Sequence, residues 1–179
     1  MNLTSASFAL LVLFSASTGV LAQHSGHQPG HHQVPMAYAG LQHRDIKALS
    51  PQQIEDLRAG RGMSQALAAE LNGYPGPMHA MELAEHLKLT AEQQTKVQAL
   101  FGAMQKEAKA LGEGLIAAER ELDALFKSRR ITPSTLDSQT QKIAQVQGRL
   151  RAVHLHKHLE MTRILTADQV DSYNRMRGY

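Results

Sequence analysis

Two histidines and a methionine near the end of the chain have a spacing that suits a metal ion. His154, His158 and Met161 follow one another at intervals of four and three residues, which places them on one face of a helix. Two imidazoles one helical turn apart can reach the same ion, and a thioether is a further ligand for softer transition metals. The alternative is a polar seam near a bundle end, in which each histidine is hydrogen-bonded to a neighbour.

A second group of potential ligands lies near the middle of the chain. His79, Glu82 and His86 are three and four residues apart, so they also share one helix face. Mixed imidazole, carboxylate and thioether ligation suits copper, nickel, cobalt or zinc, and the sequence does not choose among these metals. His86 is the weaker candidate of the three.

A third group of histidines precedes the helical part of the chain. Residues 23–43 are rich in Gly, Pro, Gln and His, and we expect them to form a disordered tail. Four histidines of this tail are weaker candidate ligands: His24, His27, His31 and His32. A flexible tract of this kind can capture a divalent metal with low affinity, and the alternative is a polar leader that happens to be rich in histidine.

The composition excludes several classes of function. The chain has 179 residues, a formal charge of +3, ten histidines, eight methionines and no cysteine. Without cysteine there is no disulfide scaffold, no thiolate-bound metal and no thiol catalysis. The sequence also has no His-Glu-x-x-His, no Gly-x-Ser-x-Gly and no Gly-rich phosphate loop, so we expect no enzymatic activity. The mild positive charge gives no indication of nucleic-acid binding.

The first 22 residues have the character of a signal peptide. An unbroken apolar run at residues 8–14 is followed by small residues and then by Val20-Leu21-Ala22, which favours cleavage after Ala22. We therefore expect a periplasmic protein with no stable insertion in the membrane. No Lys or Arg precedes the run, so a retained anchor is the alternative, although the run is shorter than the roughly 20 residues of a spanning helix.

Residues 44–179 are predicted to form one all-α domain. Three segments combine a Ser or Thr with a Gln three residues later, the capping box that begins a helix. The paired residues are Ser50 and Gln53, Thr90 and Gln93, and Thr166 and Gln169. From Val97 to Leu125, apolar residues recur in alternating steps of four and three, which predicts one long helix over residues 90–129 with a coiled-coil-like seam.

The helices must position the two groups of ligands. Arg130-Ile131-Thr132-Pro133 breaks the long helix, so the helix that follows should return antiparallel to it as a hairpin, with shorter helices at residues 50–59, 64–71 and 77–87 packed on it. His158 would then lie opposite Met104, and residue 79 near residue 99. Those levels differ by about 7–8 Å at the α-helical rise, a gap that side chains can span. The sequence therefore predicts a site of His79, His154 and His158, completed by Glu82 or Met161.

The repeated helix start also carries a resemblance to a known family. Leu-Thr-x-x-Gln occurs at residues 89–93 and again at residues 165–169, in an exported and nearly all-helical chain. This arrangement resembles the Spy/CpxP family, which includes periplasmic heavy-metal sensor and metal-resistance proteins. The resemblance covers residues 49–179. It implies a small α-helical protein, often a dimer, with either metal binding or ATP-independent chaperone activity in envelope stress.

The resemblance also implies a ligand set. The metal-sensor branch combines a histidine and a carboxylate of an early helix with a late histidine and methionine. In this chain His79 and Glu82 would take the first role, and His158 and Met161 the second. The expected function is a metal sensor or buffer, and the alternative is a chaperone or stress adaptor without a specific metal site.

The chaperone alternative depends on charge and on partners. Residues 131–179 carry seven Lys and Arg against four Asp and Glu, whereas residues 44–130 carry twelve of each. A basic helical surface edged by Leu, Met and Ala could hold unfolded periplasmic proteins weakly, and an ordinary solvated helix face has the same appearance. The expected partners are a second copy of the chain and either such clients or an envelope sensor protein.

Overall fold

The computed structural model describes residues 38–179, and within this range every regular element is helical. The all-α prediction is therefore confirmed. None of the described helices contains an apolar stretch long enough to cross a membrane. The predicted signal peptide at residues 1–22 and the candidate ligands His24, His27, His31 and His32 lie outside the described residues.

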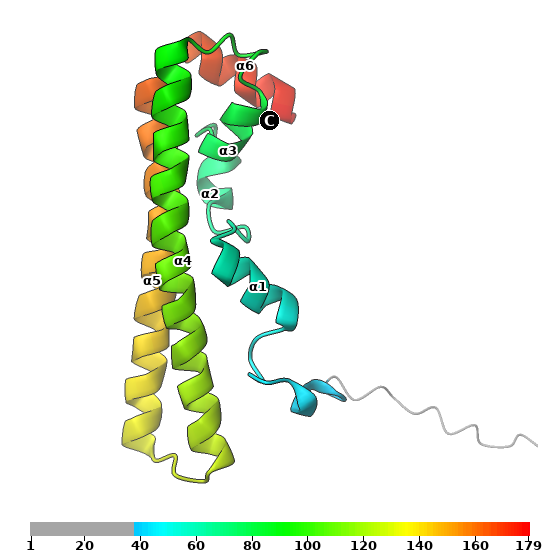
Figure 1. The fold of residues 1–179 in the computed structure, drawn as a ribbon, viewed down its shortest axis with the longest axis vertical. Coiled ribbons are helices and arrows are strands. Elements are labelled where there is room, and N and C mark those ends of the chain that lie inside the picture. The colour runs from blue at the N-terminus through cyan, green and yellow to red at the C-terminus, as the bar shows by residue number, and fades with distance from the viewer. Residues whose placement is uncertain (1–37) are drawn as a thin grey trace, which may run out of the picture. The chain divides into compact units, whose positions relative to one another are not determined.

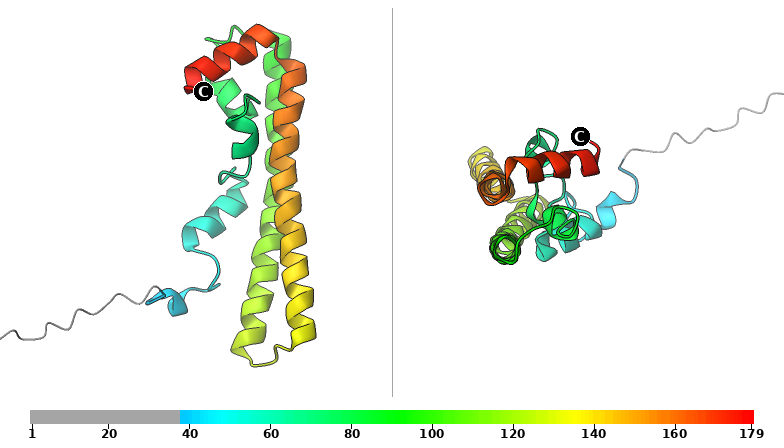
Figure 2. Two further views of the ribbon diagram at one scale, coloured as in Figure 1. Left: turned by 180° about the vertical axis from the view of Figure 1, so that it is seen from behind. Right: turned by 90° about the horizontal axis from the view of Figure 1, so that it is seen from above.

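Two long antiparallel helices form the centre of the fold (Figure 1). They are α4 (Ala91–Lys127) and α5 (Pro133–Ile164), joined by the predicted break at residues 128–132. Three shorter helices precede them and one follows: α1 (Pro51–Ala59), α2 (Leu67–Glu70), α3 (Pro77–Glu82) and α6 (Ala167–Arg177). Figure 2 shows α1 to α3 running along one side of the hairpin, with α6 crossing over its end. The predicted hairpin with shorter packed helices is thus confirmed, while the dimer stays a prediction.

The last residues of the predicted disordered tail are ordered in the structure. Leu41–His43, at the end of the predicted tail, form a single 3-10 turn named η1. Ile46 and Leu49, which follow it, are buried in the core. Their burial against the hairpin holds the preceding turn in place, an effect that the polar composition of the segment does not reveal.

The Leu-Thr-x-x-Gln repeats have a structural role that goes beyond starting helices. Thr90 and Thr166 each form a reciprocal capping box with Gln93 and Gln169. The Gln93 Nε2 donates to Gln169 Oε1 at 2.8 Å, and Gln169 Nε2 donates to Gln93 Oε1 at 3.0 Å. Both amides also donate to backbone carbonyls of other elements, Gln93 to Ile164 and Gln169 to Leu87. The two motifs therefore join the start of α4 to the start of α6.

The buried apolar side chains fall into two clusters. The first core cluster lies around α1 and the middle of the hairpin and comprises Ile46, Leu49, Leu57, Ala108, Leu115, Ile116, Ala118, Ile143 and Leu150. The second core cluster lies beneath α3 and α6 and comprises Ala80, Leu87, Leu89, Val97, Leu100, Met161, Leu165 and Tyr173. Met104, His154 and His158 are buried but belong to neither cluster.

Gly112 explains how closely α1 can approach α4. A Cβ atom at this position would lie 2.3 Å from the backbone oxygen of Leu57. Only glycine permits this contact, because any side chain would push the two helices apart. From the sequence, Gly112 indicates only a weak point in a long helix.

Candidate metal centre

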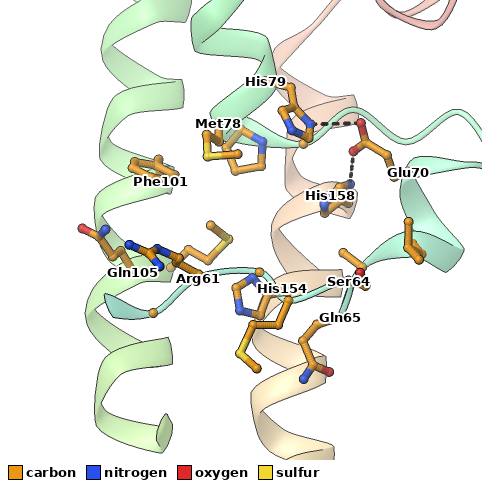
Figure 3. Close-up of a pocket in the computed structure, with 18 of the residues that line it drawn as sticks. Arg61, Ser64, Gln65, Glu70, Met78, His79, Phe101, Gln105, His154 and His158 are labelled. Carbon is orange, nitrogen blue, oxygen red and sulfur yellow. Dashed lines mark hydrogen bonds and ion pairs between the residues drawn. The ribbon is translucent and has the colours of Figure 1, made fainter. Parts of the chain in front are cut away.

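A cavity of about 580 Å³ opens between the shorter helices and the hairpin. Its lining comes from the loop after α1, from α2 and α3, from the first half of α4, and from α5 (Figure 3). The lining includes the residues Arg61, Met63, Gln65, Glu70, Met78, His79, Phe101, Met104, Gln105, His154 and His158. Three predicted ligands, His79, His154 and His158, therefore face one cavity, as the hairpin arrangement required.

The carboxylate that contacts two of these histidines is Glu70. It is 6% exposed, and its Oε1 atom lies 3.1 Å from His79 Nδ1, while its Oε2 atom lies 3.6 Å from His158 Nδ1. The Tyr173 hydroxyl donates a short hydrogen bond to Glu70 Oε1 and accepts one from the backbone N–H of Gly76 at 3.2 Å. We call Glu70, His79, His158 and Tyr173 the Glu70 cluster. It ties α2, α3, α5 and α6 together.

The hydrogen bonds fix which nitrogen of each histidine carries the proton. His158 Nδ1 lies 2.7 Å from the backbone oxygen of Tyr74, and a carbonyl oxygen only accepts, so this nitrogen is the donor. His79 Nδ1 faces both Glu70 and the Tyr173 hydroxyl, whose own proton is given to Glu70, and it is therefore also the donor. Each neutral imidazole is left with its lone pair on Nε2. Metal-binding histidines in proteins usually donate their other N–H to a carboxylate or carbonyl in this way.

The phenol of Tyr173 stays protonated in this setting. Burial raises its pKa well above the ordinary value, and the hydrogen bond to Glu70 raises it further. A protonated hydroxyl keeps Glu70 supplied with a donor. Arg177 adds a cation at the edge of the cluster, with its Nε atom 3.6 Å from Glu70 Oε1.

His154 lies one turn before His158 on α5 and has a different environment. It is 3% exposed, and its Nε2 atom is buried without a hydrogen-bond partner. Burial lowers the pKa of its imidazole, and the nearby His158, which would repel a second protonated ring, lowers it further, so His154 stays neutral at neutral pH. A neutral imidazole with an unpaired buried nitrogen is in the form that binds a metal.

The other predicted ligands do not line the cavity. Glu82 and His86 have exposed side chains, and Met161 is fully buried in the second core cluster. Glu70 was missed because it stands at the end of α2, a helix of four residues that packs against α5. The one signal in the sequence is an acidic residue nine positions before His79, a spacing that does not by itself place the two side chains together.

The cavity contains side chains of the types that bind transition metals, but their present positions do not form a coordination site. Among residues 38–179, no three or more His, Asp or Glu side chains form a group that could hold an ion. The donor set nevertheless includes three imidazoles on one cavity, two of them with their Nδ1–H groups already bonded and one with an orphaned nitrogen. Such a set fits a transition metal after rotation of side chains, and His79, with 26% of its side chain exposed, has room to turn.

Comparison with known proteins adds one finding. The heavy-metal resistance family matches residues 63–172, which include the whole hairpin and all the residues of the Glu70 cluster except Tyr173. No curated protein and no solved structure matches the chain.

Proposed function

The chain belongs to the heavy-metal resistance family, within the Spy/CpxP-like helical group, and from this premise we propose that it is a periplasmic, non-enzymatic protein that binds a divalent transition metal. The metal would be held through the Nε2 atoms of His79 and His158. One observation carries the proposal: the Nδ1 atoms of both imidazoles lie beside the same buried carboxylate, Glu70, with His79 donating to it and His158 donating to the Tyr74 carbonyl next to it. Bound metal would make the protein a buffer or a sensor of the ion.

Glu70 orients the two histidines in this proposal. Its carboxylate, together with the Tyr74 carbonyl, keeps the proton on Nδ1 and so leaves Nε2 as the ligand atom. His154 is the nearest further imidazole on the cavity, and its orphaned Nε2 makes it the third candidate ligand. The exposed Glu82 and the core residue Met161 would reach the ion only if their helices moved.

The test is metal titration of a chain whose N-terminal histidines no longer compete. In a background with His24, His27, His31 and His32 changed to Asn, nickel, cobalt, zinc and copper(II) are titrated by calorimetry. His79→Ala and His158→Ala should each weaken binding by at least about 10-fold, and Glu70→Gln by about 10- to 100-fold. His156→Ala is the matched control because His156 is exposed on the same helix as His158. Binding no tighter than millimolar, or equal binding by all these variants, would contradict the proposal.

A second candidate function is supported by exposed apolar side chains. Leu67, Leu71, Tyr74 and Met78 on the α2–α3 segment are each at least 39% exposed. Such a surface suits weak contact with an unfolded client or with a second copy of the chain. Suppression of client aggregation that a chelator leaves unchanged would favour this chaperone function, and loss of suppression on adding a chelator would favour metal dependence.

Location and assembly belong to the proposal as well. Export is tested by fusing residues 1–43 to an enzyme that is active only outside the cytoplasm, with a deletion of residues 8–14 as the control. Dimer formation is tested by sedimentation at several protein concentrations. An inactive fusion, or a monomer at every concentration, would remove the corresponding part of the proposal.

A further inference from the structure

Thioether side chains converge on the same cavity from three different elements. Met63 comes from the loop after α1, Met78 from α3 and Met104 from α4, and α5 contributes His154 opposite them. The chain has eight methionines in all, so a large share of its thioethers lines this one space. Figure 3 labels Met78 on α3 and His154 on α5, two of the side chains that line this cavity.

The orphaned nitrogen of His154 indicates that this space takes a ligand. A buried polar atom without a partner costs about 1–3 kcal/mol, and native structures seldom retain one without a reason. His154 is only 3% exposed, and it lies on the cavity wall. The occupant should therefore accept the lone pair of a neutral imidazole.

The surroundings favour a soft ion of low charge. Glu70 is the one carboxylate among the lining residues, and Tyr173 and His79 already bond to it. Arg61, the one Lys or Arg among the lining residues, is paired with Asp56. Within the described part of the chain, His154 has no hydrogen bond or ion pair with a carboxylate, so a divalent ion held there would be buried without a counter-charge, which is costly. Thioether sulfur and imidazole nitrogen instead suit a soft monovalent ion.

We propose that His154, with the thioethers of Met63, Met78 and Met104, forms a site for a soft monovalent metal ion, Cu⁺ or Ag⁺. The site does not use the Nε2 atoms of His79 and His158, and it shares with the proposed divalent site only His154, the third candidate ligand there. It rests on the proposed function in one respect, namely that the chain acts on toxic metals. Met104 is 7% exposed and lies at the buried side of the cavity lining, whereas Met78 is 45% exposed and lies at its solvent side.

The experiment is a titration with Ag⁺ in chloride-free buffer and with Cu⁺ under anaerobic conditions against a competing chelator. The background again has His24, His27, His31 and His32 changed to Asn, and Met36, which lies in the same N-terminal segment, changed to Leu. Met104→Leu and His154→Gln should each weaken binding of one equivalent by at least about 10-fold, since each removes a ligand while a Met-to-Leu change conserves volume. Met81→Leu is the matched control, because Met81 is exposed on α3 and does not line the cavity.

X-ray absorption of the Cu⁺ complex supplies a readout independent of affinity. We expect sulfur and nitrogen neighbours in the parent protein and loss of sulfur scattering in a Met63→Leu/Met78→Leu/Met104→Leu variant. Circular dichroism checks that each variant remains helical, and the single Met-to-Leu changes keep the test decisive if the triple variant does not fold. Equal Ag⁺ affinity in all the single variants, or a Cu⁺ spectrum without sulfur, would overturn the inference.

The outcomes separate this inference from the proposed function. Divalent binding that depends on His79 and His158, without methionine-dependent Ag⁺ binding, would remove the soft site alone. Methionine-dependent Ag⁺ binding without any divalent binding would remove the His79–His158 site and leave the soft site standing. Absence of both would remove both.

Discussion

His158 and His154 differ by one helical turn, yet their surroundings are opposite. Both lie on the same face of α5, and both are nearly buried, at 7% and 3% exposure. His158 donates to the Tyr74 carbonyl and adjoins Glu70, in a cluster that joins four helices. His154 Nε2 has no partner. Burial alone therefore does not define what a histidine does; the polar groups of the element packed over it do.

The segments that cover the two histidines account for the difference. Over His158 lies the α2–α3 segment, which presents the Tyr74 carbonyl, Glu70 and the tightly packed Gly76, where a Cβ atom would lie 3.0 Å from the His158 ring. On the His154 side the cavity wall is formed by the loop after α1 and by Met104, which supply no hydrogen bond to Nε2. His158 is therefore held in a fixed orientation by its hydrogen bond, whereas the Nε2 atom of His154 is free to bind a ligand.

Glu70→Ala should have the largest effect, because it removes the centre of the cluster. The Tyr173 hydroxyl and His79 would lose their acceptor inside the protein, and we expect the free energy of unfolding to fall by about 3 kcal/mol. Urea denaturation followed by circular dichroism measures this change. Glu82→Ala is the control, an exposed carboxylate on the neighbouring helix α3, and should leave stability unchanged. Equal stability of the two variants would remove the distinction between cluster and surface.

Tyr173→Phe should have a smaller effect of about 1–2 kcal/mol. It keeps the buried ring but removes the hydroxyl that bridges the Gly76 N–H and Glu70. The same denaturation experiment measures the loss, and Tyr74→Phe, which alters a more exposed phenol, is the matched control. A loss as large as that of Glu70→Ala would mean that Tyr173, and not Glu70, is the main connection between α6 and the rest.

Leucine substitution should lower the free energy of unfolding at His158 but not at His154. His158→Leu leaves the Tyr74 carbonyl without its donor and should lower the free energy of unfolding by about 1–2 kcal/mol. His154→Leu replaces an unpaired polar group by an apolar one of similar size in a largely apolar wall, and should leave stability unchanged or raise it by up to about 1 kcal/mol. If both variants lost the same stability, His154 would have to form a hydrogen bond in solution that it does not form in this structure.

The sequence predicts the elements well because their signals are local. Capping boxes at Ser50, Thr90 and Thr166 and the break before Pro133 each depend on a few adjacent residues, and all four appear in the structure as expected. The antiparallel hairpin follows from them, and it brings His79 and the two α5 histidines to one cavity. The placement of His156 in solvent also agrees with the predicted helix face.

The spacing of residues in the sequence does not predict which side chains contact the histidines of the cavity. Glu70 contacts His79 and His158 because the chain turns between α2 and α3, and that turn is set by Gly73, Pro75 and the packing of Gly76 against His158. Met161 shares a helix face with His158, but the rotation of α5 directs it into the second core cluster. A periodic pattern identifies the inner face of a helix without distinguishing a core position from a cavity wall on that face.

The pH dependence of stability provides the finest distinction between the two histidines. Burial, and then repulsion by a protonated His158, lower the pKa of His154 in the folded protein from its ordinary value of 6.5, while the unfolded chain keeps the ordinary value. As the pH falls below this value, the unfolded chain therefore takes up a proton at residue 154 that the folded chain resists. The free energy of unfolding thus falls with falling pH until the folded pKa is passed.

His154→Leu should remove this contribution, so its stability relative to the parent protein should grow between pH about 7.5 and about 5.5. The other ionisable groups that line the same cavity are present in both proteins, so their contributions largely cancel in the difference; they are Glu70, His79, His158 and Arg61. His156→Gln, an exposed change on the same helix, should show no such trend. A difference between parent and His154→Leu that is constant with pH would show that the proton at residue 154 is equally free in the folded and unfolded chains, and the contrast with His158 would then rest on hydrogen bonding alone.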